Sequence, residues 1–266
     1  MLRRLKDKTL NLKGKIRSEY AIQGSDRFWE KYDEVEKSQD IALVKIGMAR
    51  RLLDEEKMSA ALDMQMDLQA SDKSILFINF QATFALAMEK ANNLGIKAVG
   101  FDGTYSPEQR QAQVDQFQND PETKLIIITI EAGYSGWTLT RANFVFLASL
   151  PWTPAKLLQA EDRAYRLGQE NLVNVIVLKV ADTIDDPLWK VLEHKAKHAQ
   201  DIIEDDSDVF DQEKKQALEI YKISGLSSFN KGYLKGVCPS AANTLHKTQQ
   251  NLMQQAIKRP VSVARR

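Results

Sequence analysis

A short segment in the second half of the chain combines an amide with two guanidinium groups. Residues 159–169 read QAEDRAYRLGQ. If the segment is helical, Gln159, Arg163 and Arg166 fall at i, i+4 and i+7 and share one face. Two guanidinium groups of fixed positive charge suit a phosphate whose negative charge grows in a transition state. The alternative is a solvated helix face whose arginines pair with neighbouring carboxylates.

A loop with two glycines precedes this segment. Residues 129–143, the glycine loop, read TIEAGYSGWTLTRAN. Gly133 and Gly136 allow the backbone to approach a ligand closely, and exposed amides there can hold phosphate oxygens of a nucleotide or of a nucleic-acid backbone. The alternative is that the two glycines mark only a tight turn. The loop follows one apolar run and the arginine segment follows the next, and sheets of this kind bind ligands beyond the carboxyl ends of their strands.

Five apolar runs supply the elements that must position these residues. Their continuous apolar character is typical of a parallel sheet covered on both faces. The predicted strands are 75–80, 96–101, 125–130, 144–150 and 173–180. Alternation of these strands with helical segments predicts an α/β sandwich of the RecA type, a parallel sheet flanked by helices.

The predicted helices between and after the strands are 83–93, 106–117, 154–166 and a last one that starts near Pro187 and runs toward Gln200. Ser106 is expected to cap the second of these, with Pro107 in its first turn and Gln109 three residues after the cap. Thr183 is expected to cap the last.

The chain is expected to divide into three parts. Residues 1–73 read as a helical extension, because 41–68 is rich in Ala, Met, Leu, Lys and Glu with apolar residues at spacings of three and four. Residues 74–200 form the predicted RecA-like lobe. Residues 201–266 read as an acidic hinge and a mixed, basic C-terminal extension, with one more helix at 245–257.

Composition describes an ordinary soluble globular protein, with 43% hydrophobic and 27% charged residues among 266 and a net charge of +1. The charge is unevenly spread: residues 214–266 hold ten basic residues and one acidic residue, and could meet a polyanion. A single cysteine, Cys238, fits a reducing compartment, and no apolar run approaches the ~20 residues that span a bilayer. We therefore expect an intracellular, soluble protein, cytoplasmic or nuclear, with no membrane partner.

Taken in order, these segments resemble the C-terminal RecA-like lobe of the Swi/Snf-type helicase-like ATPases of helicase superfamily two. SILFINFQ resembles motif IV of that family, FDGTYSPEQRQAQVDQF its following conserved block, TIEAGYSGWTL its motif V, and PWTP with QAEDRAYRLGQ its motif VI. MLRRLKDKTLNLKGK is similar to the segment that joins the two lobes of that family, so the resemblance implies that residues 1–73 are an inter-lobe linker as well as a helical extension. The spacing between these motifs resembles that of the fork-remodelling, annealing-helicase branch of the family.

The resemblance implies roles for individual residues. Arg163 and Arg166 would be arginine fingers on the γ-phosphate of ATP. Nucleotide contacts would also come from Gln159, Gly133, Gly136 and Asp162. Contacts with DNA would come from Gln81, Thr83, Thr129, Thr138 and Trp152; an aromatic face such as that of Trp152 can stack on a base or sugar, although it can equally be a packed aromatic.

Five residues of the glycine loop depart from the family pattern. Ile130 and Glu131 stand where Thr and Arg are common, Thr138 replaces the usual Asn, and Tyr134 and Ser135 replace smaller or apolar residues. Glu131 would repel a DNA phosphate where an arginine would attract it. These departures weaken the expected DNA role of the loop more than the nucleotide role of the arginines.

The pattern GxxxxGK[ST] occurs nowhere in the chain, so it has no P-loop to cradle the β- and γ-phosphates of a nucleotide. Asp54, Glu55 and Glu56 superficially resemble an acidic magnesium motif, but they lie in a helical pattern and are expected to form a solvated helix face, and no metal site is predicted. His194 and His198 are likewise expected to be exposed side chains.

The expected function is therefore half of an enzyme: the C-terminal lobe of an ATP-dependent DNA translocase, acting on double-stranded or forked DNA and inactive alone. ATP and Mg²⁺ would bind only when a polypeptide that carries the first RecA-like lobe (a lobe-one ATPase polypeptide) supplies the GxxxxGK[ST] loop, the P-loop. The alternative is a non-catalytic module derived from this lobe that binds nucleic acid or protein, and a non-functional remnant also fits the sequence.

Overall fold

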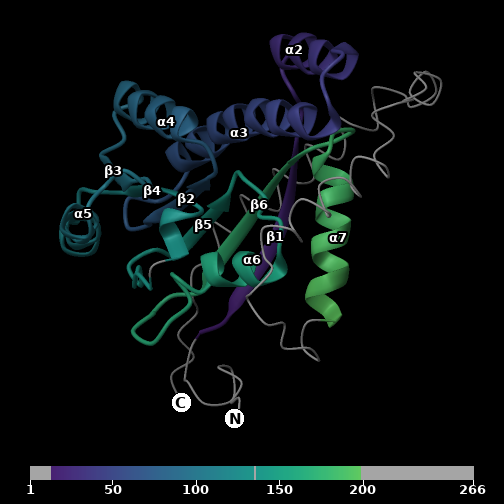
Figure 1. The fold of residues 1–266 in the computed structure, drawn as a ribbon. Helices are drawn as coiled ribbons and strands as arrows, with labels where there is room; N and C mark the ends of the chain where they lie inside the picture. The colour runs from purple at the N-terminus through teal and green to yellow at the C-terminus, as the bar shows by residue number, and fades with distance from the viewer. Residues whose placement is uncertain (1–12, 135, 199–266) are drawn as a thin grey trace.

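The computed structural model describes residues 13–134 and 136–198. At its centre is a six-stranded parallel sheet in the order β1-β6-β5-β2-β4-β3 (Figure 1). Five strands match the five predicted apolar runs: β2 (Ser74–Ile78), β3 (Ala98–Phe101), β4 (Leu125–Thr129), β5 (Phe144–Leu147) and β6 (Val173–Val180). Every residue of β2, β4 and β5 is buried, which explains why these strands read as continuous apolar runs.

The sixth strand was not predicted. β1 (Lys15–Ile22) reads KIRSEYAI and pairs in parallel with β6, from Lys15 opposite Val173 to Ile22 opposite Val180. It lies at the edge of the sheet, and five of its eight residues are exposed. An edge strand needs no apolar run, so the expectation that the region before Ser74 is helical was wrong for this segment.

The remainder of that region is helical as predicted, with α2 (Asp26–Lys37) and α3 (Ala42–Met66). α3 and α4 (Gln81–Asn93) pack against one face of the sheet. α5 (Pro107–Asn119), α6 (Pro154–Glu161) and α7 (Asp185–His198) contribute to the core on the other face. Figure 1 shows this layering, with α2 beside the first part of α3, where the two helices contribute to a third, smaller core.

The predicted cap of α5 is confirmed, whereas Thr183 lies one residue further from the start of α7 than a cap residue. Ser106 caps α5 through a capping box, in which its hydroxyl accepts from the Gln109 amide and the Gln109 side chain accepts from the Ser106 amide (2.8 Å). The Thr183 hydroxyl accepts from the amide of Asp185, the first residue of α7 (3.2 Å).

The predicted helix 154–166 is shorter than expected, because α6 ends at Glu161. After it, the chain continues in turns and also makes tertiary contacts: the Arg163 carbonyl accepts from the Leu139 amide (2.9 Å). The Gln169 side-chain amide donates to the Ala142 carbonyl (2.7 Å) and closes this turn. Gly168, at φ +98°, adopts a conformation that favours glycine.

The expected C-terminal extension (201–266), including Cys238 and the predicted helix 245–257, lies outside the described residues, as do the side chains of His194 and His198.

Candidate nucleotide and nucleic-acid site

Arg166 joins the arginine segment to the glycine loop. Its Nη1 donates to the Gly136 carbonyl (2.8 Å) and to the Thr138 hydroxyl (3.0 Å), and lies 3.4 Å from the Trp137 carbonyl. The side chain is only partly buried. One terminal nitrogen of the guanidinium therefore holds the loop, and a planar guanidinium has further N–H groups that could meet an anion.

Arg163 lies deeper, with 7% of its surface exposed. Burial lowers the pKa of its guanidinium from the ordinary value, and the positive charge of Arg166 lowers it further. The two predicted finger residues are therefore close enough for their charges to interact. A phosphate placed beside them would relieve that repulsion.

The structure corrects the expectation that Gln159, Arg163 and Arg166 share one helix face. Gln159 is an exposed residue of α6, whereas both arginines lie beyond the end of that helix, in turns that face the glycine loop. Asp162 is the C-cap residue of α6, and one of its carboxylate oxygens lies 4.0 Å from the Lys15 ammonium. The structure thus brings Arg163, Arg166, Gly136 and Thr138 together and leaves Gln159 apart in a regular helix.

Glu161, which the sequence analysis did not single out, anchors the end of α6. Its carboxylate is fully buried and accepts from Lys15 Nζ (2.5 Å) and from Arg17 Nε (2.7 Å). Lys15 and Arg17 lie at i and i+2 of β1, so their side chains leave the same face of that strand. The edge strand therefore fixes the start of the arginine segment, and this link could be found only once β1 was recognised.

The two glycines of the loop have different structural reasons. A Cβ at Gly133 would lie 3.0 Å from the Phe77 ring, so packing against β2 already requires a small residue there. Gly136 has φ +55° with open space around it. Glu131, the departure that would repel a phosphate, is exposed.

The residues expected to contact DNA follow the carboxyl ends of neighbouring strands. Gln81 follows β2 and is exposed, Thr129 ends β4, and Trp152 follows β5. Because the strands are parallel, these ends meet at one edge of the sheet. Thr83 and Thr129 are buried in this structure, so neither side chain meets solvent, whereas Trp152 is partly exposed and packs under the guanidinium of Arg50, 4.2 Å from the ring centroid.

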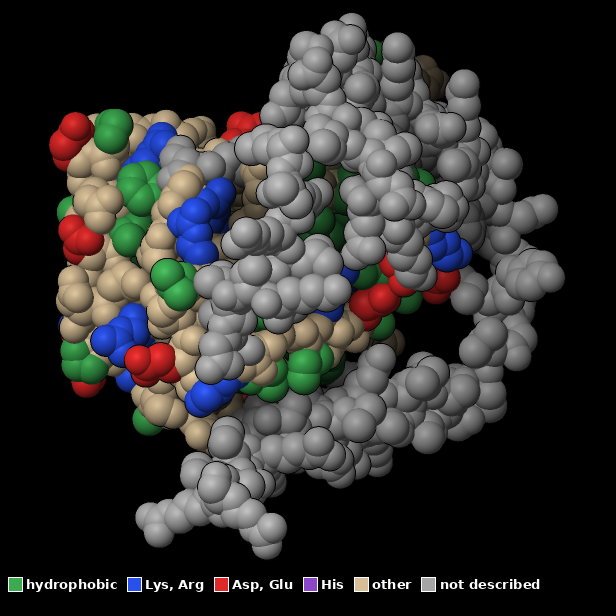
Figure 2. Space-filling model, turned by 90° about the horizontal axis from the view of Figure 1, so that it is seen from below, with side chains coloured by type: hydrophobic (Ala, Val, Ile, Leu, Met, Phe, Trp, Pro, Cys, Tyr) green, Lys and Arg blue, Asp and Glu red, His purple; other side chains and the backbone are tan. Residues whose placement is uncertain are grey.

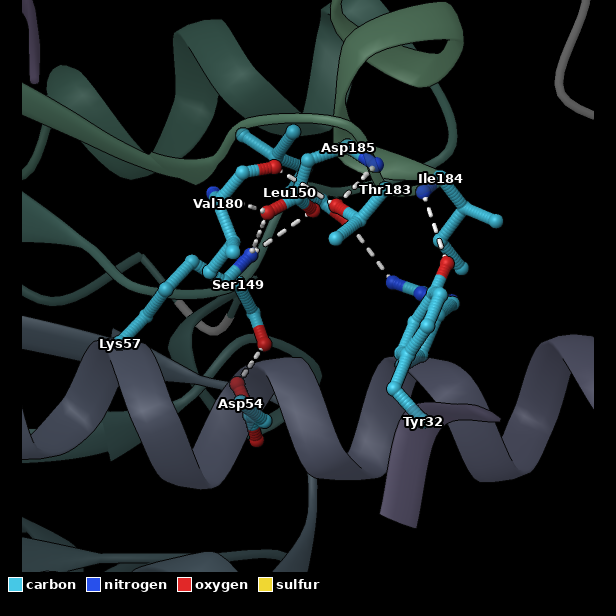
Figure 3. Close-up of polar contacts among 10 residues, drawn as sticks. Tyr32, Asp54, Lys57, Ser149, Leu150, Val180, Thr183, Ile184 and Asp185 are labelled. Atoms are coloured by element: carbon cyan, nitrogen blue, oxygen red, sulfur yellow. Dashed lines mark hydrogen bonds and ion pairs between the residues drawn. The ribbon is translucent and has the colours of Figure 1, made fainter. Parts of the chain in front are cut away.

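Asp54 was expected on a solvated helix face, and this was wrong. The side chain is fully buried: one oxygen accepts from the amides of Asn79 (3.0 Å) and Phe80 (3.2 Å), and the other accepts from the Ser149 hydroxyl (Figure 3). Burial raises the pKa of the Asp54 carboxyl, and the hydrogen bonds oppose that shift. The sequence signal was available, because Asp54 lies four and seven residues before the core residues Met58 and Ala61, and so on the same face of α3.

The amino ends of the strands, on the side of the sheet opposite the carboxyl ends, carry no surface dominated by basic side chains among the described residues. Figure 2 looks at the molecule from below, onto the end where β1 begins in Figure 1, and the described Lys and Arg side chains there are scattered among acidic and polar ones. A polar cleft of about 660 Å³ lies at this edge, and neither Arg163 nor Arg166 lines it. Its lining includes Lys73, Gln118, Thr140, Arg141, Gly168 and Glu170.

The described residues provide neither a cluster of metal ligands nor a membrane-spanning helix. Residues 13–134 and 136–198 contain no group of three or more His, Cys, Asp or Glu side chains placed to hold a metal ion. None of the helices within those same ranges has the length and apolar character needed to cross a membrane.

Comparison with known proteins supports the predicted family. The helicase conserved C-terminal domain matches residues 56–168. The human DNA annealing helicase and endonuclease ZRANB3 is 32% identical over an alignment of 213 residues that covers 74% of this chain and 20% of that protein. A Xenopus tropicalis SWI/SNF-related matrix-associated actin-dependent regulator of chromatin, subfamily A-like protein 1, is 32% identical over 54% of this chain and 15% of its own length. The chain thus spans about a fifth or less of these curated relatives.

Solved structures show the same fold. The C-terminal part of the Fun30 ATPase domain superposes with a TM-score of 0.65 at 16% identity, covering 79% of this chain and 97% of that one. The Sulfolobus solfataricus SWI2/SNF2 ATPase core in complex with dsDNA gives 0.58 at 19% identity, covering 80% of this chain and 49% of that one. With the relatives above, these matches show that the chain contains the helicase conserved C-terminal domain of the Swi/Snf-type helicase family, in its RecA-like fold.

Proposed function

We propose that this chain is the C-terminal lobe of an ATP-dependent DNA translocase, and that Arg163 and Arg166 act as its arginine fingers. The observation that carries the proposal is the pairing of two guanidiniums next to the glycine loop, with Arg166 bonded to Gly136 and Thr138. Charge that develops on a transferred phosphoryl group would be stabilised there by fixed positive charge. The same arginine bridges the loop that is expected to meet DNA, which gives a physical link between the nucleotide and DNA contacts.

The nucleotide would be held mainly by another polypeptide or by a further part of a longer one. The chain has no GxxxxGK[ST] pattern, and its described residues have no acidic cluster suited to Mg²⁺. ATP and Mg²⁺ would therefore bind at a P-loop lobe, and this chain would contribute cationic groups to the γ-phosphate. Closure of the two lobes on ATP would move their DNA contacts relative to each other.

Duplex or forked DNA would bind at the carboxyl edge of the sheet. Gln81, Thr138 and Trp152 have exposed or partly exposed side chains there or in the glycine loop, whereas Thr83 and Thr129 would need local opening to reach DNA. The relatives named as DNA helicases and the neighbour solved with dsDNA support this assignment.

The test is reconstitution. The full chain is mixed with a lobe-one polypeptide from a related translocase that carries the P-loop, and ATP hydrolysis is measured with and without duplex DNA. The proposal expects no turnover from this chain alone, and DNA-stimulated turnover from the mixture. DNA-independent turnover, or none from several matching lobe-one partners, would count against it.

A second function has one observation in its favour. Exposed Glu131 stands in the glycine loop where an arginine is common in the family, and a lobe that no longer hydrolyses ATP, and binds nucleic acid or protein by other residues, could lose that arginine freely. The chain trimmed of residues 1–12 and 214–266, which keeps β1 with its Lys15 and Arg17 contacts, separates the two ideas. Loss of a weak, steeply salt-dependent DNA affinity on trimming would indicate binding by the basic ends alone, whereas retained affinity would locate binding on the lobe.

A further inference from the structure

Three charged residues of α3 lie on one face of that helix at i, i+4 and i+7: Arg50, Asp54 and Lys57 (the α3 ridge). This face turns toward the sheet, and Asp54 and Lys57 are buried. Figure 3 shows Asp54 pointing from α3 toward the Ser149 hydroxyl, and Lys57, further along the helix, reaching Asp185. Charges are rarely buried without partners, so the contacts of this ridge indicate what it does.

Together the three members of the α3 ridge hold the segments that follow three strands, β2, β5 and β6. Asp54 accepts from both amides that lead out of β2, those of Asn79 and Phe80, and also from Ser149, which follows β5. Arg50 Nη2 donates to the Leu150 carbonyl (2.7 Å), also after β5. Lys57 forms an ion pair of 2.9 Å with Asp185, beyond the end of β6.

Two of these segments lead directly to the residues expected to contact DNA. Phe80 is the N-cap residue of α4, so Asp54 fixes the backbone immediately before exposed Gln81. Ser149 and Leu150 lie two or three residues before Trp152, whose ring also carries the Arg50 guanidinium. A single helix thus sets the relative position of two neighbouring loops at the carboxyl edge.

We propose that the α3 ridge, with Asp54 at its centre, is a positioning element for DNA binding that holds the loops bearing Gln81 and Trp152 in register. This inference rests on the proposed function. Asp54 touches no DNA in this account, because it is fully buried. It acts through three hydrogen bonds that a well-chosen amide can reproduce.

The test compares four single variants of the full chain. Asp54→Ala removes all three hydrogen bonds. Asp54→Asn is the conservative rescue, because its carbonyl oxygen can accept from both amides while its NH₂ donates to the Ser149 oxygen. Ser149→Ala removes one bond and serves if Asp54→Ala does not fold, and Glu55→Ala is the matched control at the next, partly exposed position of the same helix.

Hydrogen exchange at the Asn79 and Phe80 amides reports the positioning directly. Asp54→Ala should speed exchange of both by about tenfold or more, whereas Asp54→Asn and Glu55→Ala should leave it near the wild-type rate. Ser149→Ala should give an intermediate increase. Unchanged exchange in both Asp54→Ala and Ser149→Ala would overturn the positioning role.

Fluorescence anisotropy with a labelled DNA duplex reports the consequence. Asp54→Ala should weaken affinity by about tenfold and Ser149→Ala by a smaller factor, with Asp54→Asn at the wild-type value. A Gln81→Ala variant should weaken binding too, and adding Asp54→Ala to it should weaken binding further by less than Asp54→Ala does alone, because both act through the same loop. A merely structural role would instead give additive losses.

The outcomes separate the inference from the proposed function. Wild-type chain that fails to bind duplex DNA at low salt overturns both. Wild-type binding that is weakened by Gln81→Ala but unaffected by Asp54→Ala and Ser149→Ala overturns the α3 ridge alone.

Discussion

Replacing Lys57 with methionine should lower the free energy of unfolding by about 3 kcal/mol, because it strands a buried carboxylate. The Lys57 ammonium and the Asp185 carboxylate are 2.9 Å apart, and their side chains are only 3% and 4% exposed. Removal of one partner from a buried ion pair typically costs ~3–5 kcal/mol, since the remaining charge keeps its desolvation penalty and loses its compensation.

The structure places the cost near the lower end of that range. Asp185 keeps a hydrogen bond from the Val180 amide (3.1 Å) and lies in the first turn of α7, where the helix dipole favours a negative charge. The Asp54 carboxylate also loses the nearby positive charge of Lys57, which raises the cost of the substitution by a smaller amount. Methionine itself fills most of the space that the lysine side chain vacates.

The same reasoning predicts partial recovery in a double variant. Asp185→Asn keeps an acceptor for the Val180 amide and removes the stranded charge, so Lys57→Met/Asp185→Asn should be more stable than Lys57→Met alone. Equilibrium urea unfolding, followed by circular dichroism and tryptophan fluorescence, measures both differences if the two signals coincide.

The matched control is Lys37→Met. Lys37 forms an exposed i,i+4 pair with Asp33 (3.5 Å), and its loss should change stability by less than about 0.5 kcal/mol. A cost below about 1 kcal/mol for Lys57→Met, or a double variant no more stable than the single one, would refute the stranded-charge argument.

Two further predictions concern the stability of the fold. Burial raises the pKa of Asp54 above its ordinary 3.8, so the folded state retains a proton that the unfolded state has lost, and wild-type stability is penalised as the pH rises above that value. The unfolding free energy of Asp54→Asn relative to wild type should therefore increase from about pH 4 to about pH 7, and a decrease over that range would contradict the assigned shift. Gly136→Ala should destabilise the chain by about 1 kcal/mol, because Gly136 has φ +55°. Gly47→Ala, at an exposed position inside α3 with open space around it, should stabilise the chain by a similar amount in the same urea assay. Equal effects of the two substitutions on the free energy of unfolding would contradict the backbone argument.

The central sheet was predictable because burial on both faces leaves a strong sequence pattern. β2, β4 and β5 are buried along their whole length, so each appears as an unbroken apolar run. β1 has no such pattern, because it lies at the edge and its stability comes from pairing with β6. Local pattern cannot reveal a strand that only a distant partner defines.

The candidate site was predicted by residue type and in part misplaced in geometry. Arg163 and Arg166 do lie together beside the glycine loop, but they are held by loop contacts after α6 has ended. The burial of Asp54 was missed because a charged residue in a helix is usually solvated, and only the neighbouring backbone amides show why this one is not. In both cases tertiary hydrogen bonds, which local sequence does not reveal, determine where the side chains of the arginines and of Asp54 lie.

The most direct measurement of the central claim is ATP turnover by Arg166→Ala in the DNA-stimulated mixture with a matching lobe one. Exposed Arg141, in the same loop region, provides the matched control as Arg141→Ala. The account predicts a loss of roughly 10³-fold or more for Arg166→Ala, with duplex DNA affinity largely kept, and near wild-type turnover for Arg141→Ala. Turnover by Arg166→Ala equal to that of the wild type would contradict the finger role and, with it, the proposed mechanism.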